Sequence, residues 1–113
     1  MMTNDPPSPS LHNWDIRHAA DVDWVPWGGQ GNAKAKILAE ADGYTIALVQ
    51  AEAGYQSGAH EHAHPEFFYL LDGVVRNQGE IMNTGDAYAA DVGSVHTDFE
   101  ALASSTYISI FRL

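Results

Sequence analysis

The sequence predicts a single all-β domain, and three observations carry that prediction. Short runs rich in β-branched and aromatic residues recur along the 113 residues of the chain. Glycines separate these runs at short intervals, and no segment carries a convincing helical pattern. The chain contains no cysteine, which excludes a disulfide scaffold and a thiolate zinc site. We therefore expect a β-sandwich or β-barrel built around one core.

The first part of the chain differs in composition from the rest. Residues 1–20 are polar and proline-rich, and we expect a flexible arm there, followed by the domain at 21–113. The segment 24–32 leads into the domain as a loop or an edge, because Pro26 cannot lie in a central strand. The Ala-rich stretch GNAKAKILAEADG is the best helical candidate, although its signal is poor.

Four runs predict strands of the core. They span residues 44–51, 66–72, 86–91 and 105–111. The first of them, YTIALVQA, is apolar on both parities and suits a buried strand. In the last run Tyr107, Ser109 and Phe111 share one parity, and they alternate with Thr106 and two isoleucines.

The charge balance excludes several classes of partner. Asp and Glu number 15 against 5 Lys and Arg, so the formal net charge is -10. Such a surface repels nucleic acids and anionic membranes, and it leaves a small neutral molecule or a metal ion as the expected ligand. No apolar run is long enough to span a membrane, and the N-terminus lacks the features of a signal peptide. We therefore expect a cytoplasmic protein.

A dense group of histidines dominates the middle of the chain. The stretch GAHEHAHPEFFYLL contains His60, His62 and His64, with Glu66 two residues later. On a strand, residues i and i+2 share a face, so His60 and His62 can bind one ion. Two imidazoles and a carboxylate are the ligands of a non-haem iron site, and His96 is a candidate fourth ligand. The competing interpretation is a satisfied polar pair with no metal.

The glycine spacing around this group matches a known motif. Gly54, His60, His62, Glu66 and Gly73 follow the pattern G-x5-H-x-H-x3-E-x6-G at every fixed position. This pattern resembles the first motif of the cupin superfamily.

A second stretch is similar to the second cupin motif, G-x5-P-x-G-x2-H-x3-N. Gly85, Gly93 and His96 match it, whereas Asp91 stands at the proline position and Glu100 at the asparagine position. Both departures lie at turn or strand-end positions and leave the histidine in place.

The resemblance implies a small, single-domain, RmlC-like double-stranded β-barrel, the cupin jelly roll, which is usually a homodimer. Within the superfamily the chain is similar to the group that includes acetylacetone dioxygenase and the cupin domain of anti-sigma factors. Position by position, it implies that His60, His62, Glu66 and His96 bind a divalent ion. The ligand set accepts Fe(II), Mn, Zn, Ni or Co.

Three further residues are candidates for the lining of the pocket. His64 shares parity with His60 and His62, but a pair at 62 and 64 breaks the motif spacing. We therefore expect His64 outside the ligand set. Phe68 shares parity with Glu66 and is expected to line the cavity, and Tyr88 could reach its mouth.

The resemblance leaves three functions open, because one fold carries many activities. The first is an Fe(II) dioxygenase-like enzyme acting on a small neutral carbonyl or aromatic compound. The second is a metal-dependent isomerase or lyase, in which a base moves a proton. The third is a non-catalytic sensor module that binds a metal or ligand. No catalytic side chain beyond the metal ligands is identified.

Overall fold

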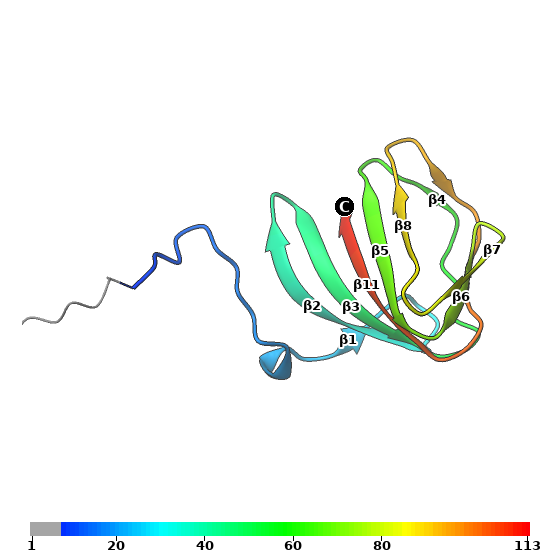
Figure 1. Cartoon of the computed structure of the whole chain (residues 1–113), viewed down its shortest axis with the longest axis horizontal. Helices are drawn as coiled ribbons and strands as arrows, with labels where there is room; N and C mark the ends of the chain where they lie inside the picture. Colours follow the sequence, from blue (N-terminus) through cyan, green and yellow to red (C-terminus); the bar gives the residue numbers. More distant parts are fainter. Residues whose placement is uncertain (1–7) are drawn as a thin grey trace, which may run out of the picture.

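The computed structural model describes residues 8–113, which are almost entirely β-structure (Figure 1). One short 3-10 helix, η1, spans Ala19–Asp21. The strands are β1 Val25–Pro26, β2 Ala33–Ala41, β3 Tyr44–Ala51, β4 His60–Glu61, β5 Glu66–Asp72, β6 Val74–Asn77, β7 Glu80–Asn83, β8 Ala87–Ala90, β9 Val95–His96, β10 Phe99–Ala101 and β11 Ser105–Arg112. The predicted all-β jelly roll is confirmed. The four predicted core strands are β3, β5, β8 and β11.

The strands form three antiparallel sheets. The large sheet has the order β1-β2-β3-β11-β5-β8, and smaller sheets contain β10-β6-β7 and β4-β9. The large sheet packs against the smaller ones (Figure 1). Within residues 8–113 the sheets form a jelly-roll sandwich and do not close into one continuous barrel. No helix in this part of the chain is long and apolar enough to cross a membrane.

The weak helical candidate is strand β2. It pairs with β3 from end to end, with a bulge between Ile37 and Ala39. Asp42 and Gly43 join the two strands, and both have positive φ, +51° and +76°. This is the backbone of a tight hairpin turn, in which Asp-Gly is favoured. Pairing along a buried neighbour therefore overrides the helical propensity of the alanines. Pro26 lies in β1 at the sheet edge, as expected.

Gly73 fixes the corner between β5 and β6, where the chain leaves the large sheet. Its φ is +116°, and its N–H donates to Thr84 Oγ1 at 3.1 Å. A Cβ placed here would lie 2.7 Å from the carbonyl oxygen of Ser104. Only glycine fits this close approach of two backbones without strain.

The core lies between the sheets and is largely aromatic. Phe68 packs against Tyr88, Phe99 and Tyr107, with ring centroids 4.7–5.7 Å apart. On β11 the parity that contains Tyr107 and Ser109 faces inward, and both side chains are buried. Its two isoleucines therefore face outward.

Candidate metal centre

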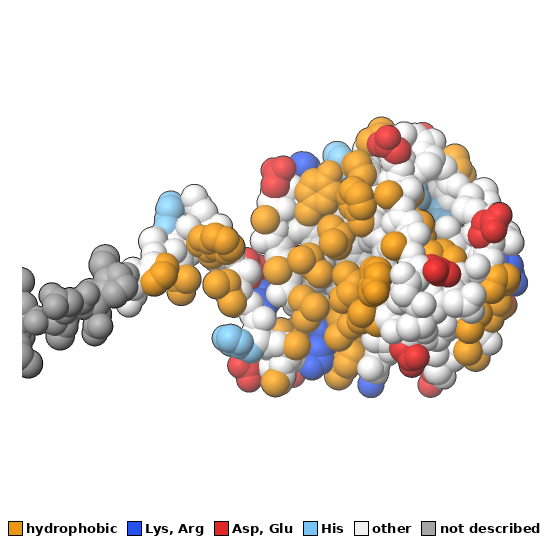
Figure 2. All heavy atoms as spheres, viewed as in Figure 1, with side chains coloured by type: hydrophobic (Ala, Val, Ile, Leu, Met, Phe, Trp, Pro, Cys, Tyr) orange, Lys and Arg blue, Asp and Glu red, His pale blue; other side chains and the backbone are white. Residues whose placement is uncertain are grey.

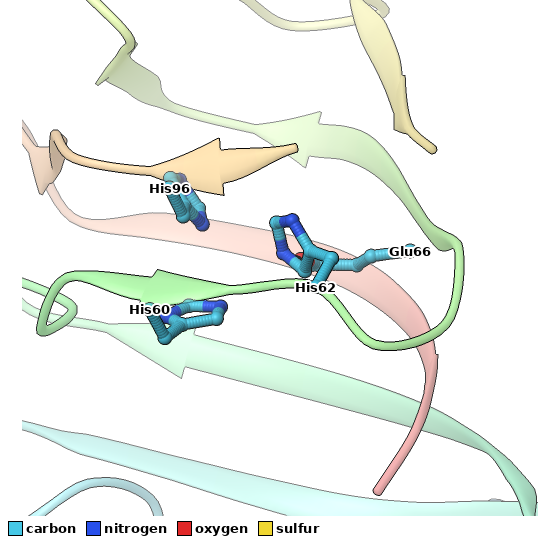
Figure 3. Close-up of side chains that lie close together, drawn as sticks. All are labelled: His60, His62, Glu66 and His96. Atoms are coloured by element: carbon cyan, nitrogen blue, oxygen red, sulfur yellow. Dashed lines mark hydrogen bonds and ion pairs between the residues drawn. The ribbon is translucent and has the colours of Figure 1, made fainter. Parts of the chain in front are cut away.

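Three separate elements bring the four predicted ligands together (Figure 3). Strand β4 pairs with β9, which places His60 directly opposite His96. The backbone of His62 continues this contact, because its N–H donates to the carbonyl of Ser94 at 2.9 Å. Glu66 is the first residue of β5, on the large sheet. The site therefore lies where the two-stranded sheet faces the large sheet.

The four side chains surround one small space. Each offers one ligand atom, and these atoms all lie within 4.8 Å of one another. The imidazole centroids of His60, His62 and His96 are 4.8–5.6 Å apart. His62 and His96 are buried, Glu66 is half-buried and His60 is exposed. Ligand atoms at this spacing can share one ion, with His60 on the solvent side.

Hydrogen bonds show which nitrogen donates in two of the imidazoles. His60 Nδ1 lies 2.9 Å from the carbonyl oxygen of Gly58, which only accepts, so Nδ1 carries the proton. His62 Nδ1 lies 2.9 Å from Ser94 Oγ, whose own hydroxyl proton goes to the carbonyl of Asp91 at 2.6 Å. His62 Nδ1 therefore donates as well. In both rings Nε2 is the nitrogen left for another partner.

The third imidazole has an unsatisfied nitrogen. His96 Nε2 lies 2.6 Å from Asn77 Oδ1 and donates to it. The other nitrogen, Nδ1, is buried without a hydrogen-bond partner among the described residues. Burial lowers the pKa of His96 from its ordinary value, which keeps the ring neutral. A buried acceptor without a partner is costly, and a metal ion would satisfy it.

Glu66 is held from two sides. Tyr88 donates its hydroxyl to Glu66 Oε1 at 3.0 Å, and Ser109 donates to the same oxygen at 3.3 Å. Burial and the Glu66 charge raise the pKa of Tyr88, so its hydroxyl stays protonated and donates. The other oxygen, Oε2, lies 2.7 Å from His62 Nε2. Two acceptors this close need a cation between them, either a proton or a metal ion.

The donor set fits a divalent transition-metal ion. Three neutral imidazole nitrogens and one carboxylate oxygen suit Fe, Mn, Co, Ni or Zn, and each is held by a second partner as metal ligands usually are. A metal-binding cupin-type centre is thus consistent with the geometry. Binding by these four residues stays a prediction.

A pocket of about 400 Å³ opens beside the four side chains. Seven aromatic side chains line it. The rings come from Trp27, Tyr55, Phe68, Tyr88, Phe99, Tyr107 and Phe111. Burial raises the pKa of Tyr107 and of Tyr55, so both hydroxyls stay neutral. Such a pocket suits a small, mainly apolar ligand with one polar end at the metal.

The predicted lining residues all lie at this pocket. His64 lies on its wall, half-buried, and is outside the group of four ligands. Phe68 is buried and stacks on Tyr88 at 4.7 Å, with the two rings 8° from parallel. Sequence reasoning missed the partners Asn77 and Ser109. The one sequence signal for Ser109 was a polar residue that shares the parity of Tyr107 on the last strand. No local pattern in the sequence indicates Asn77.

Neither departure from the second motif belongs to the group of four candidate ligands. Asp91 is in the turn between β8 and β9, where its carbonyl oxygen accepts from Ser94 Oγ. Glu100 lies in β10, where it accepts from Gln56 Nε2 at 2.5 Å and lies 3.7 Å from Arg76. The histidine of this motif, His96, keeps its place.

Comparison with known proteins identifies the family. The family model for the ChrR cupin-like domain matches residues 13–112. No curated protein sequence matches the chain at a significant level.

Solved structures share the fold. A proposed acetylacetone dioxygenase from Methylibium petroleiphilum PM1 aligns with a TM-score of 0.79 and 19% identity, over 99% of this chain and 81% of the other. KdgF from Halomonas sp. aligns with a TM-score of 0.72 and 24% identity, over 87% of this chain and 94% of the other. A chain in the complex of SigE with the anti-sigma factor ChrR from Rhodobacter sphaeroides aligns with a TM-score of 0.69 and 22% identity. The alignment covers 93% of this chain and 57% of that chain. At these identities the likeness establishes the fold alone.

Proposed function

This chain belongs to the family of ChrR cupin-like domains, and we propose that it is a metal-dependent enzyme of the Fe(II) dioxygenase type. Its substrate would be a small neutral carbonyl or aromatic compound. One observation carries the proposal: four metal-type donors face an aromatic pocket of about 400 Å³. A purely structural metal site has no need of such a pocket.

His60, His62, Glu66 and His96 would hold the ion. When bound, Fe(II) supplies electron transfer to dioxygen and polarises a carbonyl oxygen. Tyr88 keeps the carboxylate of Glu66 oriented toward the cluster. The other side chains of the pocket act on the binding of the substrate.

The pocket walls favour a neutral substrate. The aromatic rings offer apolar contact to a substrate in the pocket. Acidic groups at the pocket, Glu61 and Glu66, add to a net charge of -10 and disfavour an anion. Among residues 8–113 the one Lys or Arg on its wall is Arg112, which lies 3.7 Å from Asp42, and this carboxylate offsets its charge. The named activity of one structural neighbour, the acetylacetone dioxygenase from Acinetobacter johnsonii, agrees with a neutral substrate.

Oxygen consumption tests this proposal. Protein loaded anaerobically with Fe(II) is mixed with air-saturated buffer and a panel of β-diketones, flavonols and aromatic carbonyls. We expect substrate-dependent oxygen uptake, and none with the His96→Ala variant. An absence of uptake with every compound, in protein shown to hold iron, would refute the proposal.

A sensor module is the second candidate, favoured by the family match and by the ChrR complex among the structural neighbours. In that case the pocket binds metal or ligand without turnover. Calorimetry of the Fe(II) protein with the same panel separates the two, because a sensor would show saturable binding and no oxygen uptake.

A further inference from the structure

Two tyrosines line the pocket without belonging to the group of four candidate ligands. Tyr55 lies in the loop between β3 and β4, and Tyr107 lies on β11. Both are buried, with 5% and 4% of their surface exposed. The carbonyl of Tyr55 accepts from the N–H of Ala101 at 2.9 Å, and Tyr107 pairs with Val49 and Leu70 in the large sheet. Both rings are therefore held in place before a ligand enters.

The hydroxyls of these two tyrosines have no hydrogen-bond acceptor among residues 8–113. Burial raises the pKa of both, and the indole N–H of Trp27 beside them partly opposes this. An indole N–H can only donate, so each hydroxyl keeps a proton that no protein atom accepts. Within the described chain the enclosed side-chain atoms that lack a partner belong to Asn32 and His96, so both hydroxyls open onto the pocket.

The third tyrosine of the pocket already has an acceptor. Tyr88 donates to Glu66 Oε1 at 3.0 Å, and Ser109 donates to the same oxygen at 3.3 Å. A hydroxyl has one proton, so these two groups cannot also donate to a substrate. Among the pocket tyrosines, the protons left for a ligand are those of Tyr55 and Tyr107.

The width of about one aromatic ring separates these two tyrosines from the candidate metal ligands. Tyr107 lies two residues before Ser109 on the same face of β11, which is roughly 7 Å along the strand. The ring centroid of Phe99 lies 5.9 Å from that of His96 and 6.3 Å from that of Tyr55. A ligand that reaches both places therefore needs a spacer about as long as a benzene ring.

The charge of the pocket selects a neutral acceptor. Glu61 and Glu66 lie on its wall, and Figure 2 shows Asp and Glu side chains spread over the surface of the domain. Together with a net charge of -10, they disfavour an anionic group. A carbonyl, ether or hydroxyl oxygen accepts a hydrogen bond from a phenol without bringing a charge.

We propose that Tyr55 and Tyr107 form a second anchoring subsite, and that the substrate is a neutral, ring-sized molecule with an oxygen function at each end. One oxygen is directed at the candidate metal centre, and the other accepts from the two hydroxyls. This inference rests on the proposed function, because the metal centre receives the first oxygen. A compound with one oxygen leaves the tyrosine protons unpaired and binds less tightly.

Calorimetry on Zn(II)-loaded protein tests the subsite, with 1,4-diacetylbenzene and 4-isopropylacetophenone as probes. The second compound has nearly the shape of the first, with a methyl group in place of one carbonyl oxygen. We expect the wild type to bind the diketone about tenfold more tightly. This preference should fall about threefold in Tyr55→Phe and in Tyr107→Phe, and it should nearly vanish in the double variant.

Tyr69→Phe is the matched control, since this tyrosine is 47% exposed and lies outside the pocket. It should keep the full preference for the diketone. Circular dichroism and zinc content verify that every variant is folded and loaded. Equal binding of the two probes by the wild type, binding of neither, or an unchanged preference in the double variant would overturn the subsite.

The outcome is separable from that of the proposed function. Zinc is redox-silent, so the calorimetry reports binding alone, whereas oxygen uptake by the Fe(II) protein reports turnover. A protein that shows the tyrosine-dependent preference and no oxygen uptake keeps the subsite and loses the dioxygenase activity. Oxygen uptake without the preference would overturn the subsite alone.

Discussion

Removing the hydroxyl of Tyr88 tests how the protein holds Glu66, its candidate carboxylate ligand. Tyr88→Phe deletes one hydrogen bond of 3.0 Å to Glu66 and keeps the ring stacked on Phe68. A hydrogen bond to a charged group contributes about 1.5–3 kcal/mol. Ser109 still donates to the same oxygen at 3.3 Å, so we expect the lower end of that range. At 1.4 kcal/mol per factor of ten, metal affinity then falls about tenfold.

Metal affinity is expected to fall in Tyr88→Phe because the Glu66 carboxylate loses its fixed orientation, while all four candidate ligands remain present. With Tyr88 present, Glu66 Oε1 is occupied and Oε2 faces His62 at 2.7 Å. In the variant the carboxylate must be ordered when the ion binds, and this costs affinity. Because the pKa of Tyr88 is raised, the wild-type hydroxyl donates across the whole neutral pH range.

Competition with a chromophoric chelator measures the affinity, with Zn(II) as a redox-silent probe. Tyr107→Phe is the matched control, since it removes another buried tyrosine hydroxyl of the pocket that makes no hydrogen bond to Glu66. We expect this control to stay within about twofold of wild type. Equal affinity of Tyr88→Phe and wild type would refute the assigned role of the hydroxyl.

Three other predictions concern the ligands, pH and the fold. In the same chelator assay, His96→Ala should weaken Zn(II) binding more than about a hundredfold, and His64→Ala should weaken it less than about twofold. A larger loss in His64→Ala than in His96→Ala would contradict the ligand assignment. Burial lowers the pKa of His96, so below about pH 6.5 the unfolded chain binds a proton there that the folded chain does not. Urea unfolding of the metal-free protein should therefore show that the free energy of unfolding falls from neutral toward acid pH. A His96→Asn variant should lose part of this pH dependence. An unchanged pH dependence in the variant would contradict the role of His96. Gly73→Ala should cost about 3 kcal/mol or more, because the Cβ adds strain at positive φ and lies 2.7 Å from the Ser104 carbonyl. Thermal unfolding checks this against Gly79→Ala, which has φ +79° and open space, and equal losses in the two variants would show that the clash is absent.

Most of the core strands could be predicted from the local sequence. Runs such as 44–51 and 66–72 match β3 and β5 residue for residue, because β-branched and aromatic residues between glycine turns specify strands locally. Strand β2 was not predicted. Its alanines favour no strand by themselves, and pairing with β3 decides their conformation. The Asp42–Gly43 hairpin signal was available in the sequence and would have indicated it.

The spacing of the four candidate ligands follows from the two motifs, because each motif sets the positions of its histidines along a short strand. The surroundings of these residues depend on how the strands pack. Ser109 faces inward and donates to Glu66, and the alternation along the strand places Ile108 and Ile110 on the opposite face of the sheet. Asn77 meets His96 across 19 residues of sequence, which no local pattern encodes. Local propensities act within a strand, whereas the choice of inward face and of hydrogen-bond partner depends on elements that meet only after folding.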